Sequence, residues 1–134
     1  MTPQETAELF QSVDPETRLE LLLDYADRLP PLDPDYAPLR DAGLNMVHEC
    51  QSPVFLMAET DAGTLRLHVD VPREAPTARG FTSVLVDLFD GKPVEVLASA
   101  PEDLVHELGL TQLLGMQRKR GLAGIYYRVR SALS

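Results

Sequence analysis

The chain has 134 residues, the size of one domain, and it can bury a core without a disulfide or a metal. Its formal net charge of −9 argues against a nucleic-acid partner, which favours a basic surface. Hydrophobic residues make up 44% and charged residues 25%, as in globular proteins. No apolar run approaches the ~20 residues that cross a bilayer, and the N-terminus lacks the features of a signal peptide. We therefore expect one domain over residues 1–134, in the cytoplasm and without a membrane partner.

Two helices are predicted at the N-terminus. The first covers residues 2–13, with Thr2 as N-cap and Pro3 as the first helical residue. The second begins with Asp14 and Pro15 in the same positions and ends before Pro30. Five apolar residues repeat at helical spacing and are expected to face a core: Leu19, Leu22, Leu23, Ala26 and Leu29. The stretch 30–43 is rich in proline and aspartate and predicts a loop.

A β-hairpin is predicted in the middle of the chain. Residues 53–59 form a short apolar run, and "TDAG" at 60–63 is a turn signal. Residues 64–71 alternate apolar and polar side chains, which is typical of a half-buried strand. The hairpin is therefore expected within residues 52–71. Residues 45–49 could add a third strand and place Cys50 in the turn between two strands.

The remainder is predicted to be mostly helical. One helix follows from the apolar spacing at 81–89 and stops at Gly91, and another covers 102–108. Residues 93–99 predict either a helical turn or a short strand, with the helix favoured. The last helix carries an apolar face, and Gly121 and Gly124 make its first residue hard to predict. The residues of that face are Leu122, Ile125, Tyr126, Val129 and Leu133. The sum is an α+β fold: a small antiparallel β-sheet of about three strands covered by helices.

Cys50 is the only cysteine of the chain, and such a thiol is either inert packing or reactive. Its neighbours Glu49, Gln51 and Ser52 are polar, and an apolar run begins after Pro53. This context favours a loop at the edge of the core, where a thiol is sheltered in one state and offered in another. The adjacent Glu49 disfavours the thiolate, so a distant basic group would have to compensate.

His48 lies two residues before Cys50. If residues 48–50 are extended, both side chains point to the same side and His48 could polarise the thiol; otherwise it is a surface histidine. His48 and Cys50 could be half of a zinc site, which needs four ligands. Beside them the chain has no second cysteine and only two other histidines, His68 and His106, so no metal is expected. The chain also lacks the glycine fingerprints of nucleotide-binding sites, and no cofactor is expected.

The two ends of the chain differ in charge. Residues 1–50 carry eleven acidic residues and three arginines. After Glu107 there is no acidic residue, and the charged residues are Arg118, Lys119, Arg120, Arg128 and Arg130. Either these cations complement the acidic helices inside the molecule, or the basic end docks an acidic partner or stabilises an anion.

Four stretches of the sequence form a familiar pattern. They are "RLPPLDP" (28–34), "CQSPVFL" (50–56), "LHVDVPREAPTARGF" (67–81) and "LGLTQLLGMQRKRGL" (108–122). In order and spacing they resemble the SufE family, the sulfur-acceptor proteins of iron–sulfur cluster assembly, over roughly residues 19–133. The chain departs from the family in carrying Glu49 where glycine is usual and Phe55 where tryptophan is usual, and it has "VPRE" in place of a Ser-Asp pair.

The resemblance implies a SufE/IscU-like fold and a role as persulfide carrier rather than stand-alone enzyme. A SufS-type cysteine desulfurase, which uses pyridoxal phosphate, would donate sulfur to Cys50. A SufBCD-type scaffold would receive the sulfur, and the carrier would also raise desulfurase turnover. Arg118 matches the arginine of the last motif, a candidate for thiolate stabilisation or docking. Gln51 and Ser52 would shape the cysteine loop, and Arg79 is a further candidate for partner binding.

Two other classes of function remain open at the level of sequence. A non-catalytic interaction module would use Cys50 as a structural, buried residue and its acidic N-terminal half to bind a basic partner. A thiol-dependent enzyme would act alone on a small substrate. Whether the chain is a monomer or a homodimer does not follow from the sequence.

Overall fold

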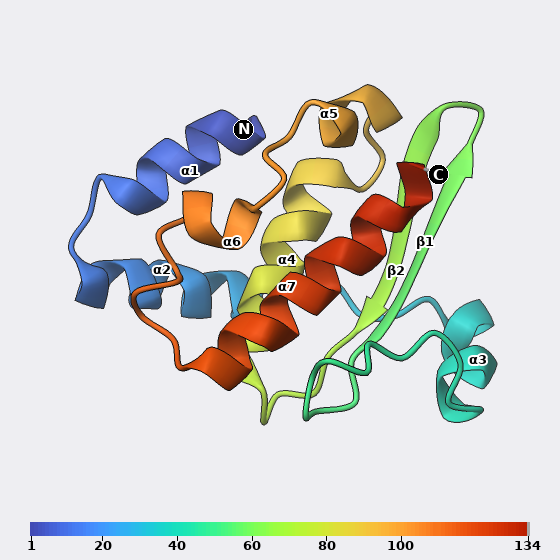
Figure 1. Cartoon of the computed structure of the whole chain (residues 1–134). Coiled ribbons are helices and arrows are strands. Elements are labelled where there is room, and N and C mark those ends of the chain that lie inside the picture. Colours follow the sequence, from blue (N-terminus) through green and yellow to red (C-terminus); the bar gives the residue numbers. More distant parts are fainter. Residues whose placement is uncertain (134) are drawn as a thin grey trace.

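A β-hairpin packed against a group of helices forms the fold, shown in Figure 1 as a computed structural model that describes residues 1–133. The sheet consists of β1 (Phe55–Asp61) and β2 (Thr64–Asp70). The longer helices are α1 (Pro3–Gln11), α2 (Pro15–Asp27), α4 (Pro76–Phe89) and α7 (Met116–Arg130). The predicted α+β class is confirmed. None of the helices in residues 1–133 is long and apolar enough to cross a membrane.

Helices α1 and α2 begin where the sequence predicts. The Thr2 hydroxyl accepts the Glu5 N–H, and the Glu5 carboxylate accepts the Thr2 N–H, a reciprocal cap. The Asp14 side chain accepts the Thr17 N–H at the start of α2.

The buried face of α2 differs from the predicted stripe. Leu22, Ala26 and Leu29 are buried, but Leu19 and Leu23 are 38% and 37% exposed, so the prediction is wrong for these two. Arg18 and Tyr25 complete the buried face instead. The reason is geometric. Leu22 and Ala26 lie against α4, whereas Arg18 and Tyr25 lie against Phe10 of α1. Leu19 and Leu23 lie on the flank of these contacts.

The stretch 30–43, predicted as a loop, is helical over residues 34–41. It contains the 3₁₀ turn η1 (Pro34–Tyr36) and the short helix α3 (Ala37–Asp41). The Tyr36 ring stacks on His68 at a centroid distance of 3.7 Å, and Arg40 pairs with Asp70 at 2.9 Å. His68 and Asp70 alternate with buried residues of β2, so α3 lies against the outward face of the hairpin.

The predicted hairpin is confirmed, but the third strand is not formed. The register runs from Phe55 opposite Asp70 to Asp61 opposite Thr64, and Ala62 and Gly63 form the turn with φ of 52° and 82°. Such a turn needs positive φ at both positions, which Gly63 adopts at no steric cost. In place of a third strand, residues 45–49 contribute only an isolated bridge between Met46 and Phe55.

The C-terminal half supplies most of the core. Helices α4 and α7 contact the inner face of the hairpin, where Leu56, Leu65, Leu67 and Val69 are buried. The predicted helical segments between them are confirmed as α5 (Val94–Ala98) and α6 (Leu104–Glu107). Of the predicted apolar face of α7, Leu122, Ile125, Tyr126 and Val129 are buried. Leu133 follows the helix and is partly exposed.

Helices α2 and α4 cross at a glycine. A Cβ atom built on Gly80 would lie 2.2 Å from the carbonyl oxygen of Leu22. The absence of a side chain at Gly80 therefore sets how closely the two helices approach.

Candidate functional site

Cys50 lies in a closed loop at the edge of the hairpin, the cysteine loop, residues 48–53. The Val47 N–H donates to the Val54 carbonyl at 2.9 Å, and the Leu56 N–H donates to the Asn45 carbonyl at 3.0 Å. Inside the loop, the Cys50 N–H donates to the Val47 carbonyl at 3.2 Å, which forms a turn at residues 48–49. The loop is therefore fixed at both ends to the start of β1.

The cysteine loop runs along one face of α7. Arg128 donates from Nη2 to the Met46 carbonyl at 3.0 Å, and the Cys50 thiol donates to the Gly121 carbonyl at 3.4 Å. Between these contacts the Glu49 side chain lies over Gly124, where an added Cβ would come within 2.6 Å of the Glu49 Cβ. An added Cβ on Gly121 would lie 3.3 Å from the Cys50 Sγ.

These helix residues were missed as parts of the site by sequence reasoning. In the sequence, Gly121 and Gly124 were noted only because they make the first residue of the last helix hard to predict. Their spacing of three, continued by Arg128 four residues later, places them on one face of a helix, and that was the available signal. The contact also accounts for Glu49 at a position where the family usually has glycine, because Gly124 leaves room for its side chain.

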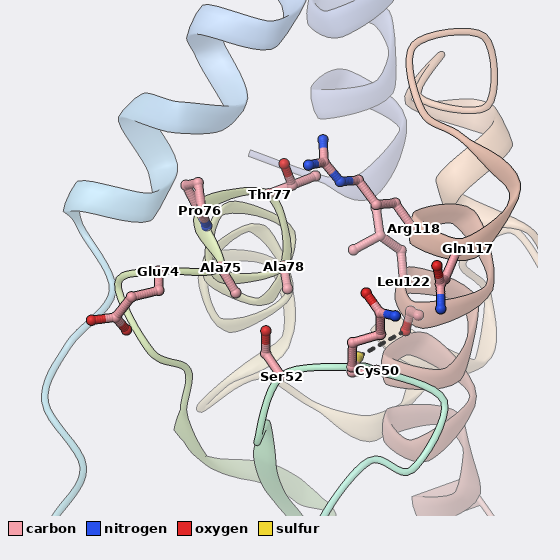
Figure 2. Close-up of a pocket in the computed structure, with 12 residues that line it drawn as sticks. Cys50, Ser52, Glu74, Ala75, Pro76, Thr77, Ala78, Gln117, Arg118 and Leu122 are labelled. Atoms are coloured by element: carbon pink, nitrogen blue, oxygen red, sulfur yellow. Dashed lines mark hydrogen bonds between the residues drawn. The ribbon is translucent and has the colours of Figure 1, made fainter.

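A pocket of about 240 Å³ opens beside the thiol, as Figure 2 shows. Three segments line it: the cysteine loop, the beginning of α4 and the beginning of α7. The side chains that matter for chemistry are Cys50, Gln51, Ser52, Glu74, Gln117 and Arg118. The pocket thus brings together the predicted residues Cys50, Gln51, Ser52 and Arg118.

The amino end of α4 forms one wall of this pocket through Pro76, Thr77 and Ala78. Ala75 is its N-cap residue and provides no side-chain hydrogen bond. The N–H groups of a first helical turn have no acceptor within the helix, so Thr77 and Ala78 present donors at this end of α4.

The thiol is held in its protonated form. Burial raises the pKa of Cys50 to about 11, and the negative charge of Glu49 acts in the same direction. At neutral pH the thiolate fraction is therefore very small, and the thiolate is the nucleophile. Burial is the larger cause, and Glu49 acts in the direction that the sequence predicted.

His48 and Arg79 are not brought to the pocket. His48 is exposed in the turn at 48–49, so residues 48–50 are not extended, and it does not line the pocket. Arg79 donates to the carbonyls of Ala26 at 2.8 Å and Val71 at 2.6 Å, and it ties α4 to α2 and to the end of the hairpin. Across residues 1–133, no cluster of three or more His, Cys, Asp or Glu side chains could hold a metal ion.

Replacing Gly124 with alanine is expected to speed alkylation of Cys50. The added methyl group collides with Glu49 only while the loop is closed, and overpacking of this kind costs ~1–3 kcal/mol. Each ~1.4 kcal/mol raises the open population about tenfold. The rate of reaction with iodoacetamide at constant pH measures this population.

A double-mutant cycle gives the control for Gly124→Ala. A Glu49→Gly background removes the three atoms nearest to the new methyl group, so Gly124→Ala should leave the alkylation rate nearly unchanged. An equal acceleration in both backgrounds would contradict the contact between Glu49 and Gly124 as the cause.

Comparisons with known proteins agree with one another. The sequence profile of SufE, described as an Fe-S metabolism associated domain, matches residues 4–133. An uncharacterized SufE-like protein of Mycobacterium tuberculosis is 38% identical over 125 residues, covering 92% of this chain and 85% of the relative. The chloroplastic SufE-like protein 2 of Arabidopsis thaliana is 37% identical over 98 residues, covering 71% of this chain and 36% of the relative.

A solved structure has the same fold. The solution structure of a hypothetical protein from Thermus thermophilus superposes with a TM-score of 0.75 and is 33% identical, and the match covers 99% of this chain and 98% of that protein. With the profile match over nearly all residues, these similarities show that the chain belongs to the SufE family and takes part in Fe–S metabolism.

Proposed function

We propose that this protein is a sulfur acceptor in iron–sulfur cluster assembly. Cys50 takes sulfur from the persulfide of a SufS-type cysteine desulfurase, raises the turnover of that enzyme, and passes the sulfur to a SufBCD-type scaffold in the cytoplasm. The observation that carries the proposal is the lone thiol on a separate loop beside a pocket, with Arg118 at the same pocket.

The proposed step is a thiol exchange on a persulfide. The Cys50 thiolate attacks the outer sulfur of the desulfurase persulfide and forms a new S–S bond. The S–S bond of the desulfurase breaks, and its cysteine leaves as a thiolate, which takes up the proton lost by Cys50. The sulfane sulfur changes carrier, and no external oxidant or reductant is needed.

The raised pKa of the buried Cys50 thiol limits when this step can occur. A thiol with a pKa of about 11 must leave its buried position before it can react at a useful rate near neutral pH. We infer that docking of the desulfurase releases the cysteine loop from α7. Outside the pocket, the main cause of the raised pKa is removed, since that cause is burial.

The pocket contains groups that can stabilise a sulfur anion, beside one acidic residue, Glu74. Arg118 lines it from α7, and the N–H groups of Thr77 and Ala78 lie at the positive end of the α4 dipole. In this proposal Arg118 stabilises the thiolate or contacts the partner, and Gln51 and Ser52 shape the loop. His48 and Arg79 lie outside this pocket and are assigned no role in it.

A structural role for Cys50 as core filling is less well supported. The thiol is half-buried and opens onto a pocket, whereas a filler residue would be enclosed on all sides. The chain also has no second cysteine that could attack a captured persulfide from within. Both features suit a carrier that keeps its sulfur until a partner takes it.

The direct test is mass spectrometry of the intact protein after incubation with a SufS-type desulfurase and cysteine. We expect the protein to gain the mass of one sulfur atom, and peptide mapping should place that sulfur on Cys50. A reductant such as dithiothreitol should remove it. If the desulfurase is loaded with persulfide and the protein gains no sulfur, the proposal fails.

A further inference from the structure

Helix α7 exposes a ridge of side chains next to the face that holds the cysteine loop. Met116, Arg120, Ala123 and Tyr127 are all exposed, and their spacing of four, three and four places them on one line along the helix. Met116 is 71% exposed and Tyr127 is 74% exposed, the highest values among the large hydrophobic residues of the described chain. We call these four residues the α7 ridge.

The α7 ridge adjoins the site. Gly121, which accepts the hydrogen bond of the Cys50 thiol, directly follows Arg120, and Gly124, which lies under Glu49, directly follows Ala123. The two faces of the helix are therefore neighbours, about 100° apart at 3.6 residues per turn. The pocket opens on the other side of the cysteine loop, along Arg118 and Leu122, so a protein that covers both the pocket and the loop comes to lie alongside the ridge.

A partner that covers the pocket must also contact the protein surface around it. Stable complexes cover about 800 Å² on each partner, far more than the opening of a pocket of about 240 Å³. Interfaces are enriched in Tyr, Met and Arg and depleted in acidic residues. The α7 ridge has this composition, whereas the exposed Leu19 and Leu23 of α2 stand among acidic residues: Glu16, Glu20, Asp24 and Asp27.

The charge around the ridge is unlike that of the rest of the molecule. Arg118, Lys119 and Arg120 lie in the first turns of α7, in a chain whose net charge is −9. The ion pairs found within residues 1–133 involve Arg40 and His68 and none of these three cations. The alternative that the basic end complements the acidic helices inside the molecule thus gains no support from ion pairing.

We propose that the α7 ridge, together with the adjacent Lys119, is a docking surface for the sulfur donor, with Tyr127 as an apolar anchor and Lys119 and Arg120 pairing with acidic side chains of the desulfurase. The inference rests on the proposed function. It identifies where the partner lies and what chemistry its contact surface has. Contacts of the ridge orient the donor toward the cysteine loop but do not touch the reacting sulfur atoms.

The test compares ridge variants with matched controls in desulfurase-coupled sulfur transfer. Tyr127→Ala is paired with Leu9→Ala, a partly exposed residue of α1, and Lys119→Glu is paired with Lys92→Glu. Lys92 follows the carboxyl end of α4, and the pocket lies at its amino end, roughly 20 Å away at 1.5 Å per residue. The two lysine variants make the same change of charge near the site and far from it, and the two alanine variants each remove a large exposed side chain.

We expect each ridge variant to raise the acceptor concentration needed for half-maximal transfer about tenfold, the scale of an interface hot spot. The maximal rate and the reaction of Cys50 with inorganic polysulfide should stay at the wild-type value. Tyr127→Phe should retain most of the affinity. Added salt should weaken transfer to the wild type more than to Lys119→Glu, because a charge pair is screened.

The outcomes separate this inference from the proposed function. If wild-type protein takes up sulfur and the ridge variants match their controls, the ridge is not the docking surface and the proposed function stands. If wild-type protein takes up no sulfur from the loaded desulfurase, the proposed function fails and the ridge proposal fails with it.

Discussion

Cys50→Ser is expected to reduce sulfur uptake from a desulfurase to the background level and to leave the fold intact. A serine hydroxyl cannot form a persulfide, so no partial activity remains. The substitution exchanges one small side chain for another at a half-buried position whose hydrogen-bond acceptor, the Gly121 carbonyl, also accepts from a hydroxyl. The free energy of unfolding should therefore change by less than about 1 kcal/mol.

The measurement is transfer of ³⁵S from labelled cysteine, together with urea unfolding of both proteins. Wild-type protein whose Cys50 has been alkylated provides a second route to the same loss without a change of sequence. Labelled sulfur that remains bound to Cys50→Ser after desalting would contradict the assignment of Cys50. Loss of activity accompanied by unfolding would point to a structural role instead.

Gly80→Ala is expected to cause the largest loss of stability of any single methyl addition considered for this chain. The new Cβ would lie 2.2 Å from the Leu22 carbonyl oxygen, a main-chain atom that moves only if α2 moves relative to α4. Overpacking of a core costs ~1–3 kcal/mol and sometimes more, and a backbone collision belongs at the upper end. We expect the free energy of unfolding to fall by about 3 kcal/mol.

The direction of this effect is decisive, because helix propensity alone predicts the reverse. Alanine inside a helix is favoured over glycine by ~1 kcal/mol. Gly115→Ala is a suitable control, since no atom lies within 4 Å of the position that its methyl group would take and its φ is −68°. Urea unfolding should show a change within about 1 kcal/mol for Gly115→Ala. An increase in stability for Gly80→Ala would contradict the close helix crossing.

Features set by neighbours in sequence could be predicted well. Thr2 and Asp14 cap their helices through bonds to residues three positions away, and the turn at Ala62–Gly63 follows from a local glycine signal. These contacts need no knowledge of the rest of the chain. The same holds for the position of Cys50 on a polar loop, because its neighbours in sequence define that environment.

Features set by distant contacts could not be predicted. Residues 30–43 look like a loop because prolines and aspartates interrupt any periodic pattern, yet Tyr36 finds His68 and Arg40 finds Asp70 across 30 or more positions. The site shows the same limit. Glu49 and Gly124 are each ordinary in sequence, and only the packing of the cysteine loop on α7 reveals that they fit together.

The hydrogen bond between Val47 and Val54 limits how far the sulfur can travel. Cys50 is three residues from Val47, and an extended chain spans at most ~3.6 Å per residue, so its Cα stays within about 11 Å of that fixed point. In the proposed function, Cys50 therefore works on a short tether rather than a swinging arm. The proposed donor and recipient would each have to bring their reactive atom within this small radius, and only one of them could occupy it at a time.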